Sequence, residues 1–378
     1  MVADSPDTSQ RLILCLVADE EVIERFPAAV RFLQVGLIDE PVDVILVVPD
    51  HKRARSLASG PTTVITHRKP AWPLGHWARH NVIAAVRQKI DSLHRHAGVI
   101  VHGLSLTAAP IAGALAAELG AELVLKVTSV AGLHDAEMLR TLDRASALIT
   151  PAEVIREAIR ASPMGAKSVE VVPLGVETDD APAAFNNPQA APSLIFAGAL
   201  DPRSGVDTLL HATKRVLRRY PNVQLFILGK GPAEADFRHL AKVLDISLNV
   251  TFVGRLEPPR PAMRAADIFC LPRALSVYRE EPIHAMASGL AIVAAQGVLC
   301  DGLVHRQTAL LFPDQDEADL AVQIGWLLEN PRAAQTIAAT AQAYTRQHHA
   351  VSHMVTAYLR IYRRLIARLG TLSLPANQ

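Results

Sequence analysis

The chain has 378 residues, half of them hydrophobic, and a formal net charge of +1. This length predicts two domains, and the near-zero charge argues against a nucleic-acid-binding protein. The three cysteines are far apart, which argues against a disulfide framework and a structural zinc site, so we expect no metal. Residues 1–10 are unlike a signal peptide and no apolar run is long enough to span a bilayer, so we expect a cytoplasmic protein.

The first half of the chain alternates short apolar runs with helical patterns. The apolar runs have the length of strands and lie at 11–17, 42–50, 62–67, 97–103 and 121–129. The stretch between the last two runs predicts a helix that Gly120 ends. Runs that are apolar throughout are typical of parallel strands covered by helices on both faces. We therefore predict an α/β, Rossmann-like, doubly wound domain over residues 1–177.

The composition changes after this domain. Residues 178–193 are rich in Ala, Pro and Asn and have no periodicity, which predicts an interdomain linker. The alternation of apolar runs and helices resumes over residues 194–350 and predicts a second Rossmann-like domain. Residues 351–378 have the pattern of a final amphipathic helix. Ligands of such sheets bind beyond the carboxyl ends of the strands, so residues in those places are the candidates for chemistry.

Several motifs of the second half occur in a characteristic order. They are "VEVVPLGVET", "FAGALDPRSGVDTLLHA", "FILGKGPAEADFRHLAKVLDI" with "VTFVGRL", "AADIFCLP", and "HAMASGLAIVAA" with "TALLFP". Together they resemble the GT-B glycosyltransferases of family 4, most strongly over residues 170–365. The resemblance implies two domains facing a central cleft, with the last helix crossing back to the first domain.

The same resemblance implies a reaction. Its members transfer a sugar from a nucleotide sugar, here a UDP- or GDP-linked one, to a glycan or lipid-linked acceptor in envelope polysaccharide or glycolipid synthesis. No cofactor is implied beyond this co-substrate. The positions that the resemblance assigns to the nucleotide sugar are Gly198, Ser204, Gly229, Gly231, Ser276 and His284. We add Arg203 and Arg255 as nearby cations, although the family uses mostly backbone groups near Arg255. Glycine-bearing turns let backbone N–H groups approach a pyrophosphate, and cations stabilise it as its charge develops.

Four charged residues of the family pattern are replaced in this chain. Ala199 and Ser204 stand where the family has an arginine and a lysine, and Ser276 and His284 stand where it has two glutamates. Each charged hydrogen bond to a ligand contributes about 1.5–3 kcal/mol, so the combined loss is about 5 kcal/mol or more without replacement. An unmodified donor site cannot absorb that loss.

Nearby charges suggest a relocated set of site residues. Arg203 precedes the lost lysine position by one residue, and Arg273 and Arg279 lie near the start of the altered helix. Glu280 and Glu281 precede His284 by four and three residues, spacings that share a helix face. Charges at helix starts are also common as solvated caps. As catalytic candidates we take His102, Arg203, Glu280, Glu281 and His284.

The first half supplies the candidates for the acceptor side. His102 ends an apolar run and matches the second histidine of the family's "HxH" motif, whereas Ile100 replaces the first. A plain histidine at a strand end is an equally good interpretation. Lys126, Thr128 and Ser129 follow another strand, where relatives often carry polar contacts.

A basic segment with aromatic residues lies at 51–80. Trp72 and Trp77 alternate there with cationic groups, and such a surface can contact anionic lipid headgroups at the inner face of a membrane. A solvated surface with two packed tryptophans is the alternative.

Two other functions stay open. A catalytically inactive homologue, acting as a binding or scaffold protein, would also explain the four lost charges. A GT-B sugar-nucleotide epimerase is a third, weaker alternative because the motif order follows the transferases. The sequence does not predict the oligomeric state, the donor sugar, or whether the stereochemistry is retained.

Overall fold

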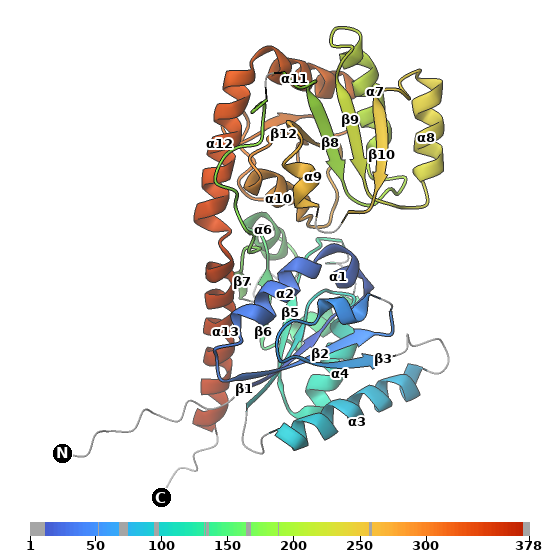
Figure 1. Cartoon of the computed structure of the whole chain (residues 1–378). Helices are drawn as coiled ribbons and strands as arrows, with labels where there is room; N and C mark the ends of the chain where they lie inside the picture. Colours follow the sequence, from blue (N-terminus) through green and yellow to red (C-terminus); the bar gives the residue numbers. More distant parts are fainter. Residues whose placement is uncertain are drawn as a thin grey trace, which may run out of the picture. The chain divides into compact units, whose positions relative to one another are not determined.

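The structure is a computed structural model. It describes residues 12–51, 53–67, 75–93, 98–131, 133, 136–163, 168–187, 189–256 and 259–372. The chain divides into two compact units, residues 1–175 with 351–378 and residues 176–350 (Figure 1).

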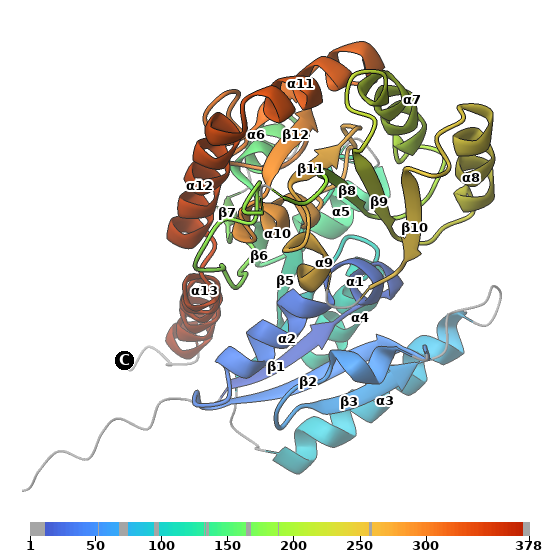
Figure 2. The same ribbon diagram turned by 45° about the horizontal axis from the view of Figure 1, so that its top comes forward.

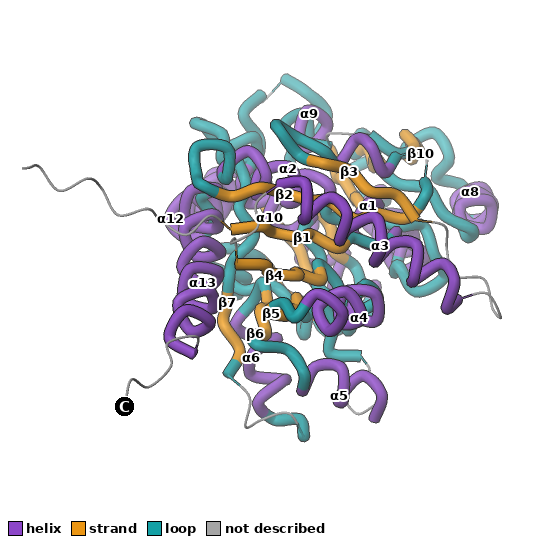
Figure 3. Tube along the Cα trace, turned by 90° about the horizontal axis from the view of Figure 1, so that it is seen from below, coloured by secondary structure: helices purple, strands orange, loops and turns teal. Residues whose placement is uncertain are grey.

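The first unit is built on a seven-stranded sheet in the order β3-β2-β1-β4-β5-β6-β7, and every described strand pair is parallel (Figure 3). Its strands are β1 (Leu12–Val17), β2 (Val42–Pro49), β3 (Thr63–His67), β4 (Gly98–Gly103), β5 (Glu122–Lys126), β6 (Ala147–Thr150) and β7 (Val169–Val171). Strands β1 and β6 are buried along their whole length, as expected for runs that are apolar throughout.

Helices connect these strands. They are α1 (Glu20–Arg25), α2 (Pro27–Gly36), the 3-10 helix η1 (Ala54–Leu57), α3 (Gly75–Leu93), α4 (Ala109–Leu119), α5 (Ala136–Asp143), α6 (Glu153–Arg160) and α13 (Val351–Leu372). Helix α4 ends at Gly120, whose φ of 60° is left-handed, so the predicted helix end is confirmed.

Strand β4 packs between two helices, and its side chains alternate between them. A Cβ atom at Gly98 would overlap Ile366 of α13, and one at Gly103 would lie 3.1 Å from Ala112 of α4. His102 is four residues after Gly98 and therefore faces α13 too. The alternation of the strand thus directs this histidine toward a helix that lies far away in the sequence.

The second unit is built on a six-stranded parallel sheet in the order β10-β9-β8-β11-β12-β13 (Figure 2). Its strands are β8 (Ser193–Ala197), β9 (Gln224–Leu228), β10 (Val250–Gly254), β11 (Ile268–Leu271), β12 (Ala291–Ala295) and β13 (Leu310–Phe312). The inner strands β8, β11 and β12 are wholly buried, whereas residues along the edge strand β10 are partly exposed. The predicted α/β class with two Rossmann-like parallel sheets is confirmed.

Six helices of the second unit are described, and they fall into two groups by the helices that they contact. They are α7 (Val206–Leu217), α8 (Glu234–Val243), α9 (Arg260–Met263), α10 (Glu281–Ala287), α11 (Glu317–Glu329) and α12 (Pro331–His348). Helix α7 packs against α8 and α11, whereas α10 packs against α9 and α12. In the described part of the chain, no helix has the length and apolar character needed to cross a membrane.

Residues 178–193, which the composition predicts as a linker, lie within the second unit and pack on it. Ala183 and Ala184 are buried, and both of their N–H groups donate to the carbonyl oxygen of Gly289 at 2.9 Å. The N–H of Phe185 donates to the Asp267 carboxylate at 2.8 Å. The segment therefore forms part of the cover of the second sheet.

Candidate functional site

The loops that follow β8 and β9 lie against each other, and glycines permit this contact. A Cβ atom at Gly229 would overlap the carbonyl oxygen of Gly198, and one at Gly231 would overlap the backbone of Leu200. The N–H of Leu200 donates to the carbonyl oxygen of Lys230 at 3.1 Å. The three glycines that the sequence assigns to the nucleotide sugar are thus brought together at the carboxyl ends of neighbouring strands.

The loop from Gly198 to Gly205 leads into α7. Ser204 is buried, and its Oγ accepts from the Val206 N–H at 3.5 Å, so it supports the start of the helix. Arg203 is exposed and forms no ion pair with any other described residue. Its backbone N–H donates to the Asp201 carboxylate at 2.8 Å, which shapes the loop. The Arg203 guanidinium is therefore exposed to a ligand, whereas the Ser204 hydroxyl is buried and accepts a hydrogen bond from the backbone.

Arg279 is a buried cation that lies against the start of the loop after β8. Only 5% of its side chain is exposed. Its Nη2 donates to the carbonyl oxygen of Ala197 at 2.6 Å, and its guanidinium lies 5.5 Å from the centre of the Phe196 ring. Its Nε and Nη2 lie 3.4 Å from the Glu281 carboxylate. The side chain comes from the β11–α10 connection and ends beside β8.

The first turn of α10 places an acid and a histidine side by side. Glu280 precedes the helix and His284 follows one turn later, and Nε2 of His284 lies 3.8 Å from Oε1 of Glu280. The two side chains are largely buried, with 17% and 13% exposed. The Oε2 atom of Glu280 is buried and hydrogen-bonds no other described residue. A buried carboxylate oxygen without a partner is costly, and a ligand hydroxyl could satisfy it.

The charge of this pair is set by opposing effects. Burial lowers the pKa of His284, but the nearby carboxylate of Glu280, followed by the charge of Glu281, outweighs it and raises the pKa above the ordinary value. Protonation of His284 is thereby favoured relative to a histidine in water. The histidine that replaces the family's second glutamate is hence paired with a carboxylate one helical turn away.

Arg255 interacts with the charge of Glu280, whereas Ser276 is exposed. Burial lowers the pKa of Arg255, and the charge of Glu280 counteracts this, so the two residues interact electrostatically across the loop after β10. The charge of Glu280 thus acts on both His284 and Arg255.

In the first unit, His102 is completely buried. Its Nδ1 is hydrogen-bonded to the Tyr362 hydroxyl at 2.7 Å, and its Nε2 meets no hydrogen-bond partner among the described residues. Burial, and then the charge of Lys126, lower its pKa to about 3. The imidazole is therefore neutral at physiological pH and packs with the tyrosines of α13. This environment favours the plain structural interpretation of His102.

The other acceptor-side candidates lie at the carboxyl end of β5, whose last residue is Lys126, and just beyond it. Lys126 is mostly buried, and its Nζ lies 5.7 Å from the centre of the Phe26 ring. Thr128 is buried, and the Ser129 Oγ accepts from the Ala131 N–H at 3.1 Å. Trp72 lies outside the described residues, as do residues 68–74 and the side chain of Trp77.

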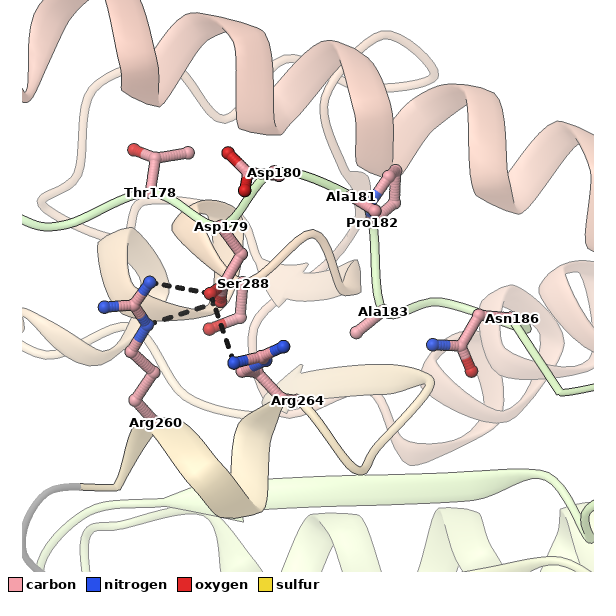
Figure 4. A pocket seen from close by; sticks show the side chains of 10 residues that line it. All are labelled: Thr178, Asp179, Asp180, Ala181, Pro182, Ala183, Asn186, Arg260, Arg264 and Ser288. Atoms are coloured by element: carbon pink, nitrogen blue, oxygen red, sulfur yellow. Dashed lines mark hydrogen bonds and ion pairs between the residues drawn. The ribbon is translucent and has the colours of Figure 1, made fainter.

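A second polar site in the second unit was missed by the sequence interpretation. A pocket of about 330 Å³ is bounded by residues 178–183 and by α9, and Figure 4 shows its lining. Arg260 binds the buried Asp179 carboxylate with two nitrogens, at 2.6 and 3.3 Å, and Arg264 approaches it at 3.7 Å. The spacing of four residues between the two arginines was the one local signal of a shared helix face. Their acidic partner lies too far away in the sequence for any local pattern to reveal it.

No cluster of three or more His, Cys, Asp or Glu side chains with metal-binding geometry occurs among the described residues.

Comparison with known proteins agrees with this architecture. The sequence model of the family "Glycosyl transferases group 1" matches residues 191–330. The phosphatidyl-myo-inositol mannosyltransferase of Mycobacterium tuberculosis is 31% identical over 211 residues, which are 53% of this chain and 54% of that protein. The chain thus spans about half the length of the curated relatives it matches.

Solved structures resemble nearly the whole chain. The Anabaena protein HepE in complex with UDP and glucose has a TM-score of 0.74 at 17% identity, covering 93% of this chain and 99% of that one. Sucrose-phosphate synthase from Thermosynechococcus elongatus has a TM-score of 0.73 at 20% identity, covering 95% and 100%. These likenesses show the fold, and with the family match they confirm the resemblance found in the sequence.

Proposed function

We propose that this chain, with its GT-B fold and its group 1 glycosyltransferase sequence over residues 191–330, transfers a sugar from a nucleotide-sugar donor. The observation that carries the proposal is the Glu280–His284 pair beside Arg255, at the carboxyl ends of the second sheet. Three ionisable side chains converge there within the segment that matches the family. Such convergence at a strand-end site is typical of ligand recognition.

The residues of this site have complementary roles in the proposal. The backbone of the loops at Gly198 and Gly229 receives the diphosphate, and the exposed Arg203 lies beside it as a cation. The free oxygen of Glu280 and the imidazole of His284 bind hydroxyl groups of the ribose or the sugar. Glu280 thus replaces, one helical turn earlier, a carboxylate that the family has at position 284. Glu281 contributes indirectly, because its negative charge raises the pKa of His284.

The acceptor belongs to the same proposal. Relatives of this chain include a mannosyltransferase named for phosphatidyl-myo-inositol, which is a lipid acceptor. We therefore propose a glycan or lipid-linked acceptor in envelope polysaccharide or glycolipid synthesis, reached in the cytoplasm or at the inner face of the membrane. The basic segment 51–80 would provide the membrane contact.

Isothermal titration with UDP, GDP and their common sugar conjugates tests the donor site. Saturable binding, with slow hydrolysis of one conjugate, is the expected result. Glu280→Gln should weaken binding of the nucleotide by about tenfold, since a hydrogen bond to a charged group contributes about 1.5–3 kcal/mol. A matched control is Glu177→Gln, because Glu177 is an exposed acid of the same unit that pairs with Arg260. Absence of binding at millimolar concentrations would sink the proposal.

The second candidate is an inactive homologue that binds a nucleotide, a glycan or a partner enzyme. The residues Ala199 and Ser276, where the family has charged groups, favour this alternative. It predicts nucleotide binding without any turnover of the sugar conjugate. Single-turnover assays with each conjugate separate the two functions, because even a slow transferase hydrolyses its donor measurably when enzyme is in excess.

A further inference from the structure

We propose that Arg279 supplies the cation that binds the diphosphate of the donor, in place of the arginine that is absent at position 199. The inference rests on the proposed function and names a residue that none of the motifs assigns to the ligand. It follows from where the guanidinium of Arg279 lies, how it is held, and which of its nitrogens remains unbonded.

The first step is the position of the guanidinium. A Cβ atom built on Gly198 would overlap Nη2 of Arg279, so the charged group lies directly against the loop after β8. Ala199, the next residue of that loop, has no charge to offer. The cation is therefore present at the loop, but it comes from the connection between α10 and the neighbouring strand β11.

The second step is the rigidity of the guanidinium. The hydrogen bond to the carbonyl oxygen of Ala197, the Phe196 ring and the Glu281 carboxylate all restrain it. A charge held in place in advance loses little entropy when it binds an anion, and it stabilises charge that develops during the reaction. A flexible surface arginine, such as Arg203, lacks this advantage.

The third step is the remaining hydrogen-bonding capacity. An arginine has five N–H donors, and those that the described residues engage belong to Nε and Nη2. Among the described residues, no acceptor is bonded to Nη1. Glu281 lies at 3.4 Å, a long contact for a charge-assisted bond, so it neutralises the guanidinium only partly. A phosphate oxygen is the ligand that matches such a donor.

Titration calorimetry with pyrophosphate, UDP, GDP and the corresponding nucleosides tests this inference on the full chain. For Arg279→Met we expect a loss of diphosphate affinity of about tenfold to a hundredfold, with nucleoside affinity unchanged. Arg279→Lys keeps the charge without the planar fork and should recover part of the loss. The control is Arg215→Met, since Arg215 is an exposed cation of the same unit that lies in the last turn of α7 and pairs with Glu317 at 2.8 Å.

The outcomes separate the inference from the proposed function. Binding of pyrophosphate that depends on Arg279, without binding of any nucleotide, would support the anion site and overturn the transferase. Equal diphosphate affinity in wild type and Arg279→Met would overturn the inference. Higher affinity in the variant would overturn it too, because it would mean that the guanidinium blocks the site. Equal nucleoside affinity and an unchanged circular dichroism spectrum show that the variants are folded.

Discussion

The imidazole of His102 in β4 is hydrogen-bonded at 2.7 Å to the hydroxyl of Tyr362 in α13, although 260 residues separate them in the chain. Both side chains are fully buried in the first unit. Tyr358 of α13 packs on the same imidazole, with ring centres 5.5 Å apart. A polar contact of this kind specifies how the helix docks on the sheet, because a misplaced helix would leave the histidine buried without a partner.

The stability of the protein should fall on acidification because of His102. Its pKa is about 3 in the folded state against about 6.5 when unfolded, so between these values only the unfolded chain takes up the proton. The contribution is complete above about pH 6.5 and is lost as the pH falls toward 3. We expect a change of up to about 1.4 kcal/mol per pH unit in the free energy of unfolding. Urea titrations from pH 7 to pH 4 measure it.

Two variants isolate this effect. In His102→Phe, the free energy of unfolding should depend less on pH, by the equivalent of one proton taken up on unfolding. This holds whatever the effect of the substitution on stability at pH 7. Tyr362→Phe keeps the ring packing, removes the hydroxyl and should cost about 1 kcal/mol at pH 7. An unchanged slope in His102→Phe would show that the imidazole is not shielded from protons as its burial implies.

His284 should behave in the opposite way. Its pKa is raised in the folded state, so its contribution to stability is complete below about pH 6.5 and is lost as the pH rises through the folded-state pKa. In Glu280→Gln the carboxylate no longer opposes burial, and the pKa of His284 should fall clearly. Glu281→Gln should lower it less, because Glu281 acts by charge alone. NMR titration measures the pKa of His284 in the wild type and in the two variants. Equal pKa values in all three proteins would contradict the pairing of Glu280 with His284.

The contact between the loops after β8 and β9 predicts unequal effects of two glycine-to-alanine substitutions. Gly231→Ala places a methyl group in the backbone of Leu200 and should destabilise the second unit by about 3 kcal/mol or more. Gly325→Ala, in the interior of α11, meets no atom within 4 Å and should stabilise by about 0.5–1 kcal/mol through helix propensity. Thermal unfolding of both variants tests this, and similar midpoints would refute the close approach.

The Asp179 cluster should also contribute to stability. Asp179→Asn removes the charge that faces Arg260 and Arg264, and we expect a loss of about 2–3 kcal/mol because the carboxylate is buried. Glu177 pairs with the same Arg260 but is 62% exposed, so Glu177→Gln should cost less than about 1 kcal/mol. Chemical unfolding at low salt measures both. A loss of similar size in the two variants would show that burial does not govern this cluster.

Local patterns in the sequence were sufficient for the fold. The apolar runs correspond to strands, and Gly120 ends its helix, because both depend on neighbours within a few residues. The motif order likewise located the loops at Gly198 and Gly229 and the start of α10. These features repeat in each α/β unit, so a pattern of length ten to twenty residues is enough to recognise them.

Local sequence patterns could not predict which residues individual side chains contact. His102 was placed at a strand end, but nothing local shows that α13 covers the face to which it points. Arg279 was noticed only as a charge near a helix, because its contact with Ala197 crosses from one strand to its neighbour. Composition assigned Asp179 to a linker. It could not show that Arg260 binds the Asp179 carboxylate and that Arg346 donates to its carbonyl oxygen. Tertiary contacts decided all three.

The first unit is assembled from two pieces of chain that the ribosome makes at different times. Its sheet is complete by Val171, yet α13, which supplies Tyr362 and covers Gly98, comes only after residue 350. The second unit is continuous, and Val176 pairs with Ala350 where the chain enters and leaves it. During synthesis the second unit can therefore finish folding first, while the part of the first sheet that α13 covers, around Gly98 and His102, is still exposed.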